Sequence, residues 1–476
     1  MSFKLSPSRR HLKTALYAVS LALSPASQSI AKMPALDPAA DLVFTVQAEG
    51  RHASVRLLTQ ALECPAISWD GQAAGSTMSL RAEPATVPAR SGGAQQESKD
   101  VVFKVRVCEA EWPTGVRRGS IAGRHIPAPK TQIRRVVIIA DTGCRMKGSE
   151  NAFQPCSDPR KWPLAQIARS AAATHPDLVI HLGDIHYRES PCPAGNTGCL
   201  DSPWGYGYDT WQADLFTPAR PLLAAAPWLF VRGNHESCSR AGQGWFRFLE
   251  TKPWTEARSC NDPALDAEAD HTDPYAVPLT PDTQLLVFDS SKTSGKPYSG
   301  HEPAYKKYAA QVLAVDRLSQ QAPHSFFLSH HPLLAIAPER ADSSVQSGGN
   351  AGLLSVFSNA YLARLFPEKV DVAMHGHLHY FEALSFKTAH PASLVMGNTA
   401  SANEGAVPMR LPAGMQPYPG AVVADYMGRD DYGFVTLDRV ASSRSDQWLL
   451  TEHDVMGKPV IRCRLRGSES RCKAVR

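Results

Sequence analysis

Five short apolar runs, rich in β-branched residues, recur through the central part of the chain. They are residues 136–140, 178–182, 228–231, 326–328 and 370–373. Short apolar runs bounded by Gly and Pro are typical of buried strands. Stretches with helical character lie between several of them, at residues 163–173, 208–225 and 304–320. Strands that alternate with helices usually pair in parallel, so the pattern predicts an α/β fold built on a parallel sheet.

A polar cluster follows each apolar run. The five clusters are Asp141-Thr142-Gly143, Gly183-Asp184-Ile185-His186-Tyr187, Gly233-Asn234-His235-Glu236, His330-His331-Pro332 and Gly376-His377-Leu378-His379. Sites on such sheets form at the carboxyl ends of the strands, so we expect the clusters to meet at one edge. Their carboxylate, phenol, amide and imidazole groups suit borderline metals such as iron, zinc and manganese. Seven potential ligands exceed the needs of one tetrahedral ion, which predicts a dinuclear centre.

Taken in order, the clusters resemble the motifs of the calcineurin-like metallophosphoesterases, and within them the purple acid phosphatases. Those motifs are Asp-x-Gly, Gly-Asp-x-x-Tyr, Gly-Asn-His-Asp/Glu, a His-x-Pro segment after a strand, and Gly-His-x-His. All five are present across about half of the chain. The resemblance implies an α/β metallophosphoesterase sandwich of two mixed β-sheets flanked by helices, which we place at residues 131–476.

The first two motifs favour the purple acid phosphatase subclass. Most metallophosphoesterases carry a metal-binding His where this chain has Gly143, so one ligand is missing. Purple acid phosphatases use the tyrosine of the second motif, and Tyr187 is present. The Ser/Thr protein phosphatases share the segment 232–236, but they also carry Gly-Asp-x-x-Asp-Arg-Gly, which this sequence lacks.

The resemblance assigns ligands to two ions, with Asp184 bridging them. The first ion would be bound by Asp141, Asp184, Tyr187 and His379, and the second by Asp184, Asn234, His330 and His377. Anionic tyrosinate is a hard, strongly donating ligand, which favours Fe(III) at the first position. Fe(II), Zn or Mn would occupy the second position.

Four further residues are candidates for contact with the substrate. His235 resembles the family histidine that contacts the phosphate. Alternatively, His235 is only hydrogen-bonded near the site and does not contact the substrate. His331 is a candidate catalytic residue, although strand alternation would point it away from its neighbour His330. The family histidine about nine residues beyond the His-x-Pro ligand is absent, and Glu339 and Arg340 stand in that region. Arg340 could bind the substrate phosphate and Glu339 could act as an acid, or both could be solvated loop charges.

The predicted function is hydrolysis of small phosphate monoesters by a metal-bound hydroxide. Two metal ions would neutralise the phosphoryl oxygens and lower the pKa of the attacking water. One alternative is phosphodiester hydrolysis at the same site. Another, from a different class, is an exported protein that binds a metal or ligand on this scaffold without catalysis. Retention of Asp184, Asn234 and His235 argues against that second alternative.

The N-terminal residues predict export to the periplasm or the medium. Basic residues precede an apolar run at 14–23, and small residues follow up to Ala31, as in a secretory signal peptide spanning 1–31. The segment 8–13 also resembles a twin-arginine signal. Removing residues 1–31, which hold four Lys or Arg and no Asp or Glu, would lower the formal charge from +5 to +1. A nearly neutral chain gives no support for nucleic-acid or membrane-surface partners.

Cysteines and strand patterns complete the predicted organisation. Ten cysteines in an exported chain predict disulfides rather than a thiolate metal site. Proximity favours the pairs Cys144–Cys156, Cys192–Cys199, Cys238–Cys260 and Cys463–Cys472, which leaves Cys64–Cys108. Apolar runs at 42–46, 53–57 and 101–107 carry no ligand cluster. They predict a small β domain at residues 41–130, before the catalytic domain.

Overall fold

Two large β-sheets form the framework of this protein. The computed structural model describes residues 1–2, 36–37, 41–72, 75–90, 98–337, 345–403, 405–440 and 447–475. The chain divides into the units Met1–Pro34 and Ala35–Arg476, and every strand and helix that the structure describes lies in the second unit. The predicted signal segment therefore falls almost entirely outside the described residues.

The first sheet has eleven strands, in the order β26-β25-β24-β23-β11-β14-β15-β1-β2-β8-β5. Its centre is the parallel trio β11 (Arg135–Ile139), β14 (Leu178–His181) and β15 (Trp228–Phe230). Antiparallel strands continue it beyond β11, namely β23 (Gly433–Arg439), β24 (Gln447–Asp454), β25 (Pro459–Arg466) and β26 (Glu469–Ala474). The sheet is therefore mixed, with its parallel core at the strands that carry the first three clusters.

The second sheet has seven strands, in the order β16-β17-β18-β19-β21-β20-β22. Parallel pairing joins β17 (Thr283–Val287), β18 (His324–Leu328), β19 (Val370–His375) and β21 (Ala392–Met396). Antiparallel strands complete both edges, namely β16 (Tyr275–Pro278), β20 (Phe381–Phe386) and β22 (Val423–Arg429). The last two ligand clusters follow strands of this sheet.

The two sheets pack face to face because alternate residues of their strands are apolar on both sides. Val136 and Ile138 of β11 lie in the core between the sheets, with Phe326 of β18. Val137 and Ile139, the intervening residues of β11, face the opposite side. Successive side chains of a strand point to opposite faces, so a continuous apolar run serves two cores at once.

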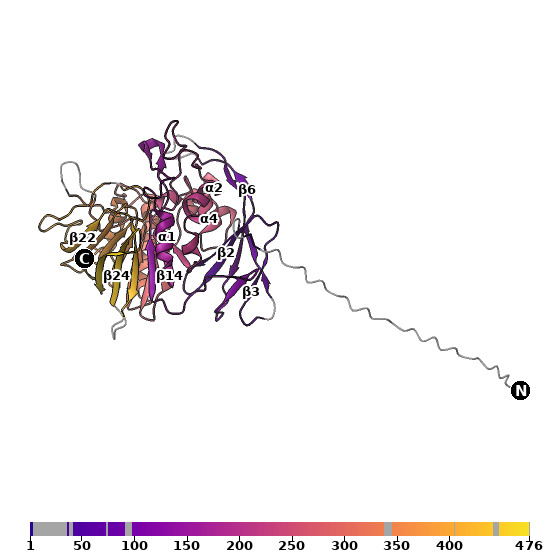
Figure 1. Ribbon diagram of the computed structural model, residues 1–476. Helices are drawn as coiled ribbons and strands as arrows, with labels where there is room; N and C mark the ends of the chain where they lie inside the picture. Colours follow the sequence, from indigo (N-terminus) through magenta and orange to yellow (C-terminus); the bar gives the residue numbers. More distant parts are fainter. Residues whose placement is uncertain are drawn as a thin grey trace. The chain divides into compact units, whose positions relative to one another are not determined.

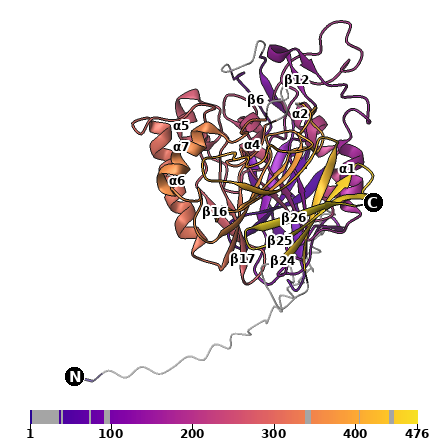
Figure 2. The same cartoon turned by 90° about the vertical axis from the view of Figure 1, so that its left-hand side faces the viewer.

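Helices cover the outer face of each sheet. The first sheet is covered by α1 (Leu164–Ala172), α2 (Tyr208–Trp211), α3 (Arg220–Leu223) and α4 (Gly242–Phe248). The second is covered by α6 (Pro303–Ser319) and α7 (Ala351–Ala360). Figure 2 shows α6 and α7 on one side of the strands and α1 on the other. The arrangement confirms the predicted sandwich of two mixed sheets flanked by helices.

Short elements make up the remaining regular structure. The strands are β3 (Ala66–Trp69), β4 (Ser76–Thr77), β6 (Ala85–Val87), β7 (Val101–Phe103), β9 (Gly119–Ile121), β10 (Arg124–His125), β12 (Met146–Lys147) and β13 (Ala152–Phe153). The helices are η1 (Gly148–Glu150), η2 (Gln212–Phe216), η3 (Asn234–Glu236), η4 (Glu256–Arg258), η5 (Pro263–Leu265) and α5 (Asp266–Ala269). Among them, η2 is a π-helix, and η3 carries one of the ligand clusters.

The N-terminal strands extend the first sheet. They are β1 (Leu42–Gln47), β2 (Ala53–Thr59), β5 (Ser79–Ala82) and β8 (Arg106–Glu111), and β1 pairs in parallel with β15. Figure 1 shows β2 and β24 on opposite sides of β14, as the strand order requires. The buried Arg81 donates hydrogen bonds to the carbonyls of Phe246, Glu250 and Lys252. The division into domains at residue 130 stays a prediction.

Two predicted elements are interrupted in the structure. The predicted helix at 208–225 is divided into α2, the π-helix and α3. Pro218 and Pro221 lack an N–H group and cannot continue the helical hydrogen bonds. The predicted strand at 101–107 is divided into β7, which pairs with β6, and β8, which pairs with β2 and β5. The two halves of this apolar run therefore pair with different strands.

Across the described part of the chain, no helix combines the length and the apolar character that crossing a membrane requires.

Candidate metal centre

The predicted ligands lie where strands of both sheets end. They are Asp141 after β11, Asp184 and Tyr187 after β14, Asn234 after β15, His330 after β18, and His377 and His379 after β19. The backbone turns sharply at three of these positions, since φ is 52° at Asp141, 54° at Asp184 and 73° at His377. Residues other than glycine rarely adopt this left-handed region, and the surrounding structure must hold them there. The turns direct the polar side chains into one place.

Tyr187 lies at the centre of one half of the site. Its hydroxyl donates hydrogen bonds to Asp141 Oδ1 at 2.9 Å and to Asp184 Oδ2 at 3.1 Å. The same oxygen is 2.8 Å from His379 Nε2. On the other side of the imidazole ring, His379 Nδ1 is 2.7 Å from the carbonyl of Ala402. That contact fixes the ring, so Nε2 is the atom that faces the site.

The second half gathers around Asp184. Ligand atoms of Asp184, His330 and His377 all lie within 4.8 Å of one another. His330 Nδ1 is 2.8 Å from the carbonyl of Leu182, and its Nε2 is 3.1 Å from Asp184 Oδ2. Asp184 Oδ2 therefore contacts both Tyr187 and His330, which belong to different halves. A carboxylate in this position can bridge two cations.

Burial and the close approach of these groups shift their pKa values. Burial opposes the charge of His330, yet the carboxylate of Asp184 raises its pKa to about 9. Burial also favours a neutral Asp184, but the imidazoles of His330 and His235 keep the pKa of Asp184 well below its usual value. At Asp141 burial prevails and raises the pKa. A proton on His330 thus balances the buried carboxylate of Asp184 in the metal-free protein.

The residues present fit a pair of metal ions. Asn234 Oδ1 is buried and has no hydrogen-bond partner among the residues that the structure describes. A buried amide oxygen without a partner is costly, and a cation would satisfy it. The imidazoles of His330 and His379 are each oriented by a carbonyl on Nδ1, a common arrangement behind metal-binding histidines. Metal ions would replace the imidazole protons, since metals bind the neutral form of histidine.

Gly143 leaves the space in which the loop of Tyr187 is packed. A Cβ atom at this position would lie 2.5 Å from the carbonyl oxygen of Ile185 and 2.8 Å from the backbone nitrogen of Tyr187. No side chain larger than a hydrogen fits without displacing that loop. The same packing arrangement therefore places Tyr187 in the site and excludes a histidine at position 143.

Asp214 holds that loop in place and was not identified from the sequence. It lies on the π-helix and is fully buried. Its carboxylate accepts hydrogen bonds from the backbone N–H of Cys144 at 3.1 Å and of Tyr187 at 2.9 Å, and pairs with Arg188 Nε at 2.6 Å. The segment 210–216 carries no motif, so only its place in the fold reveals this role.

Glu236 has the corresponding role for the other half of the loop. Its carboxylate accepts backbone hydrogen bonds from Gly233, Asp184, Ile185 and His186, at 2.8–3.1 Å. Burial and the charge of Asp184 raise its pKa to about 7. The final residue of the Gly-Asn-His-Glu cluster therefore supports the ligands rather than binding metal.

The structure places both candidate histidines beside the ligands. His235 Nδ1 is 2.9 Å from the carbonyl of His186, and its ring centroid is 3.9 Å from that of Tyr187. The ring centroid of His331 is 4.2 Å from that of His377, and its Nδ1 is 3.1 Å from Ser290 Oγ. His331 thus approaches the site, although strand alternation pointed it elsewhere. Arg340 and Glu339 lie outside the described residues.

Sequence patterns did not indicate two charged residues next to His235. Arg240 Nη2 lies 2.7 Å from His235 Nε2, and Arg240 Nε lies 2.5 Å from Glu189 Oε1. Burial and then the positive charge of Arg240 hold the pKa of His235 well below its usual value. Both residues stand close to motif residues in the sequence, but neither belongs to a family motif that would have identified it.

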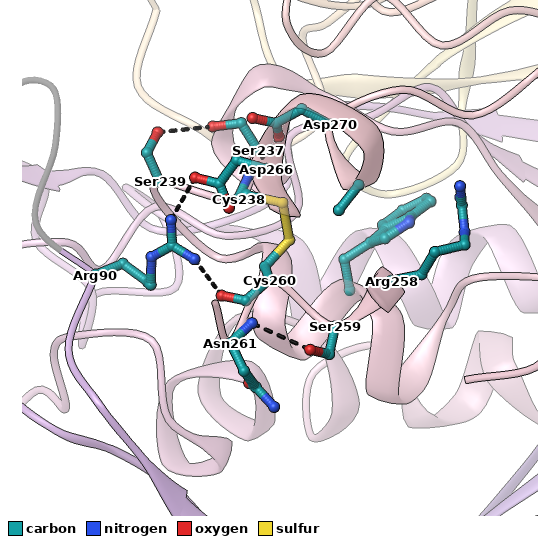
Figure 3. The surroundings of a disulfide bond; sticks show 12 residues. Arg90, Ser237, Cys238, Ser239, Arg258, Ser259, Cys260, Asn261, Asp266 and Asp270 are labelled. Carbon is teal, nitrogen blue, oxygen red and sulfur yellow. Dashed lines mark hydrogen bonds and ion pairs between the residues drawn. A yellow bond between two sulfur atoms is a disulfide. The ribbon is translucent and has the colours of Figure 1, made fainter. Parts of the chain in front are cut away.

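All five predicted disulfides are present. They are Cys64–Cys108, Cys144–Cys156, Cys192–Cys199, Cys238–Cys260 and Cys463–Cys472, and no cysteine of the chain is free. Figure 3 shows the Cys238–Cys260 bridge, where Arg90 from the N-terminal region contacts the carbonyl of Cys260 and the carboxylate of Asp266. Three bridges therefore hold loops that follow the first three ligand clusters.

Comparison with known proteins identifies the class. A family model described as calcineurin-like phosphoesterase matches residues 134–381, slightly more than half of the chain. The chain belongs to the calcineurin-like phosphoesterase family, and it is accordingly a metal-dependent phosphoric ester hydrolase. No curated protein sequence matches it.

Solved structures show what the fold is similar to. Purple acid phosphatase PPD1 from yellow lupin (Lupinus luteus) seeds aligns with a TM-score of 0.53 at 15% identity, covering 91% of this chain and 74% of that chain. The structure of PhoD aligns with a TM-score of 0.48 at 10% identity, covering 91% of each chain. At this identity the lupin phosphatase supports the assignment of the fold.

Replacing Asp214 by Asn tests whether this residue holds the Tyr187 loop. The variant leaves Arg188 buried without its charge partner, and such losses typically cost about 3–5 kcal/mol of unfolding free energy. We expect that decrease in urea denaturation of the metal-free protein. We also expect weaker retention of metal, since Tyr187 and Asp184 lie on the loop that Asp214 anchors.

Asp438→Asn is a matched control for this experiment. Asp438 pairs with Arg135 at 2.6 Å, but both side chains are partly exposed. Its loss should change the unfolding free energy by less than about 1 kcal/mol and leave metal content unchanged. Wild-type stability and metal retention in Asp214→Asn would show that the loop is held by other contacts.

Proposed function

We propose that this protein hydrolyses phosphate monoesters at a dinuclear metal site. The observation that carries the proposal is the position of Asp184 between the Tyr187 and His330 halves of one buried cluster. Asp141, Tyr187 and His379 would bind the first ion, Asn234, His330 and His377 the second, and Asp184 both. When bound, the ions supply a water of lowered pKa and positive charge for the phosphoryl oxygens.

The protein side chains would orient the substrate. The ring of His235 lies beside that of Tyr187 in this cluster, so we propose that His235 contacts the phosphoryl group. His331 remains a candidate catalytic residue, because its ring lies against that of the proposed ligand His377. The assignment of Arg340 to substrate binding stays a prediction. Diesters are the alternative substrates for the same site.

We further propose Fe(III) as the first ion. The phenol of Tyr187 lies within hydrogen-bond distance of Asp141 and Asp184, so all three oxygens could bind a single hard cation. Fe(II), Zn or Mn would fill the position shared by the histidines His330 and His377.

Asp184→Asn should separate metal binding from the other roles of the site. The substitution removes the negative charge that would hold two cations together, so we expect loss of metal and of activity. His235→Ala should keep the metal and slow turnover by roughly 10²–10³, the scale for losing one charge-stabilising donor. Metal content by elemental analysis and turnover of 4-nitrophenyl phosphate measure the two effects.

Asp158→Asn serves as the control for these variants. Asp158 pairs with the exposed Arg160 and takes no part in the ligand cluster. This variant should behave as the wild type in both measurements. Metal loss in His235→Ala would make His235 a supporting residue, and full metal content in Asp184→Asn would contradict the bridging assignment.

Tyr187→Phe tests the identity of the first ion. Coordination of tyrosinate to Fe(III) gives a visible charge-transfer absorption, which a phenylalanine cannot support. The oxidised protein should be pink to purple, and the variant should be colourless. Tyr208→Phe, which alters another buried tyrosine, should keep the colour. A colourless wild type that contains only zinc or manganese would refute the iron assignment and leave the dinuclear site in place.

Export is the remaining part of the proposal. Five disulfides indicate folding in an oxidising compartment, and the N-terminal pattern resembles a secretory signal. Protein isolated from its native host should begin near Lys32 and should show few free thiols when denatured without reductant. The reduced sample should show ten thiols. An intact Met1 together with ten free thiols before reduction would contradict export.

A further inference from the structure

Arg240 occupies a distinctive position at the margin of the metal centre. Its side chain is 17% exposed, whereas its partner Glu189 is 4% exposed. Arg240 Nε lies 2.5 Å from Glu189 Oε1, and Nη2 lies 2.6 and 2.7 Å from the two ring nitrogens of His235. The hydroxyl of Tyr206 donates to the same oxygen of Glu189 at 3.1 Å. The guanidinium is thus held between a buried carboxylate and the proposed phosphate contact.

The backbone around Arg240 is fixed in place. The N–H of Arg240 donates to the carbonyl of Ser237 at 2.9 Å, and the N–H of Ala241 donates to the carbonyl of His235 at 3.0 Å. Between them, Cys238 is bonded to Cys260, and its N–H donates to Asp270 (Figure 3). A side chain on such a turn is preorganised, which lowers the cost of binding a ligand.

Among the described residues, the guanidinium of Arg240 contacts Glu189, His235 and Tyr206, which is fewer contacts than it has N–H groups. A guanidinium carries five N–H groups in a planar fork. Glu189 accepts from Nε, and His235 Nδ1 is occupied by its contact with the carbonyl of His186, which leaves only Nε2 of that ring as an acceptor. A planar fork of this kind matches two oxygens of a phosphoryl group.

A second cation, Lys147, lies close enough to act on both partners of Arg240. Lys147 is 17% exposed and pairs with Glu150 at 2.5 Å. Its charge acts on both His235 and Glu189, in the same direction as that of Arg240. A purely structural partner for Glu189 would need one positive charge and no second contact. A structural ion pair between Arg240 and Glu189 would not require the additional contact of Arg240 with His235.

We propose that Arg240 binds the phosphoryl group of the substrate beside His235 and favours monoesters over diesters. This inference rests on the proposed function and specifies its substrate class. A monoester carries a charge of about −1.5 to −2 and three acceptor oxygens. A diester has one charge fewer, and a second ester group replaces one of those oxygens. The guanidinium fork therefore gains more from a monoester, while Glu189 keeps it oriented.

The experiment compares Arg240→Gln and Arg240→Lys on two substrates that share a leaving group. These are 4-nitrophenyl phosphate and bis(4-nitrophenyl) phosphate. We expect Arg240→Gln to lower kcat/KM for the monoester by about 10²–10³. The diester should lose less than about tenfold, so the monoester-to-diester ratio falls at least tenfold. Arg240→Lys should lie between, because lysine keeps the charge and loses the fork.

Two further measurements separate binding from folding. The dissociation constant of inorganic phosphate, measured by calorimetry, should rise at least tenfold in Arg240→Gln while metal content stays at the wild-type level. If that variant does not fold, the double variant Glu189→Gln/Arg240→Gln removes both buried charges and should show the same change of ratio. Arg160→Gln is the matched control, since Arg160 is 88% exposed and pairs with Asp158 at the surface.

The outcomes distinguish this inference from the proposed function. An equal loss on both substrates, unchanged phosphate binding, or a gain of activity in Arg240→Gln would overturn the role of Arg240. If the wild type and Arg240→Gln prefer the monoester to the same extent, the proposed function stands and this inference is refuted. A wild type that prefers diesters would refute the monoester proposal, and a tenfold fall in the ratio would still support Arg240.

Discussion

The site depends on the packing of two sheets through one shared apolar core. Because Val136, Ile138 and their counterparts in the second sheet pack together in that core, the strands hold a fixed register and end at a common edge. The candidate ligands follow the strand ends, beyond this apolar core. Left-handed turns at Asp141, Asp184 and His377 then bring the predicted ligands together. The apolar pattern thus determines the position of the chemistry, although it takes no part in it.

A second constraint links the missing side chain at Gly143 to the candidate ligand Tyr187. Gly143 has no room for a Cβ because the backbone of Ile185 and Tyr187 occupies that space. Asp214 secures this arrangement by accepting hydrogen bonds from both segments. The presence of Tyr187, and the absence of a histidine at position 143, therefore depend on how the two loops and Asp214 pack together. A single exchange at position 143 could not reverse it without moving the loop.

Much of the fold followed from local patterns. Apolar runs and their spacing were sufficient to predict the central strands, α1 and α6, because each buries its own side chains in a regular period. Cysteine proximity predicted four disulfides, since short loops bring their ends together, and Cys64–Cys108 followed as the remaining pair. The region 208–225 was predicted as one helix and is interrupted, because its prolines remove backbone donors. The run 101–107 was divided because its two halves pair with different strands.

The sequence by itself determined which side chains could bind metal, since a motif preserves residue type and spacing along the chain. Only the tertiary structure decided which groups surround them. Asp214 reaches the site from a segment that carries no motif, and Arg240 lies just beyond a motif that does not include it. His331 turns toward His377 although strand alternation directed it away. The physical reason is that a metal ligand is recognised by its own residue type and its neighbours in the sequence. Supporting contacts depend on how separate segments pack, and the order of residues along the chain does not give the distances between those segments.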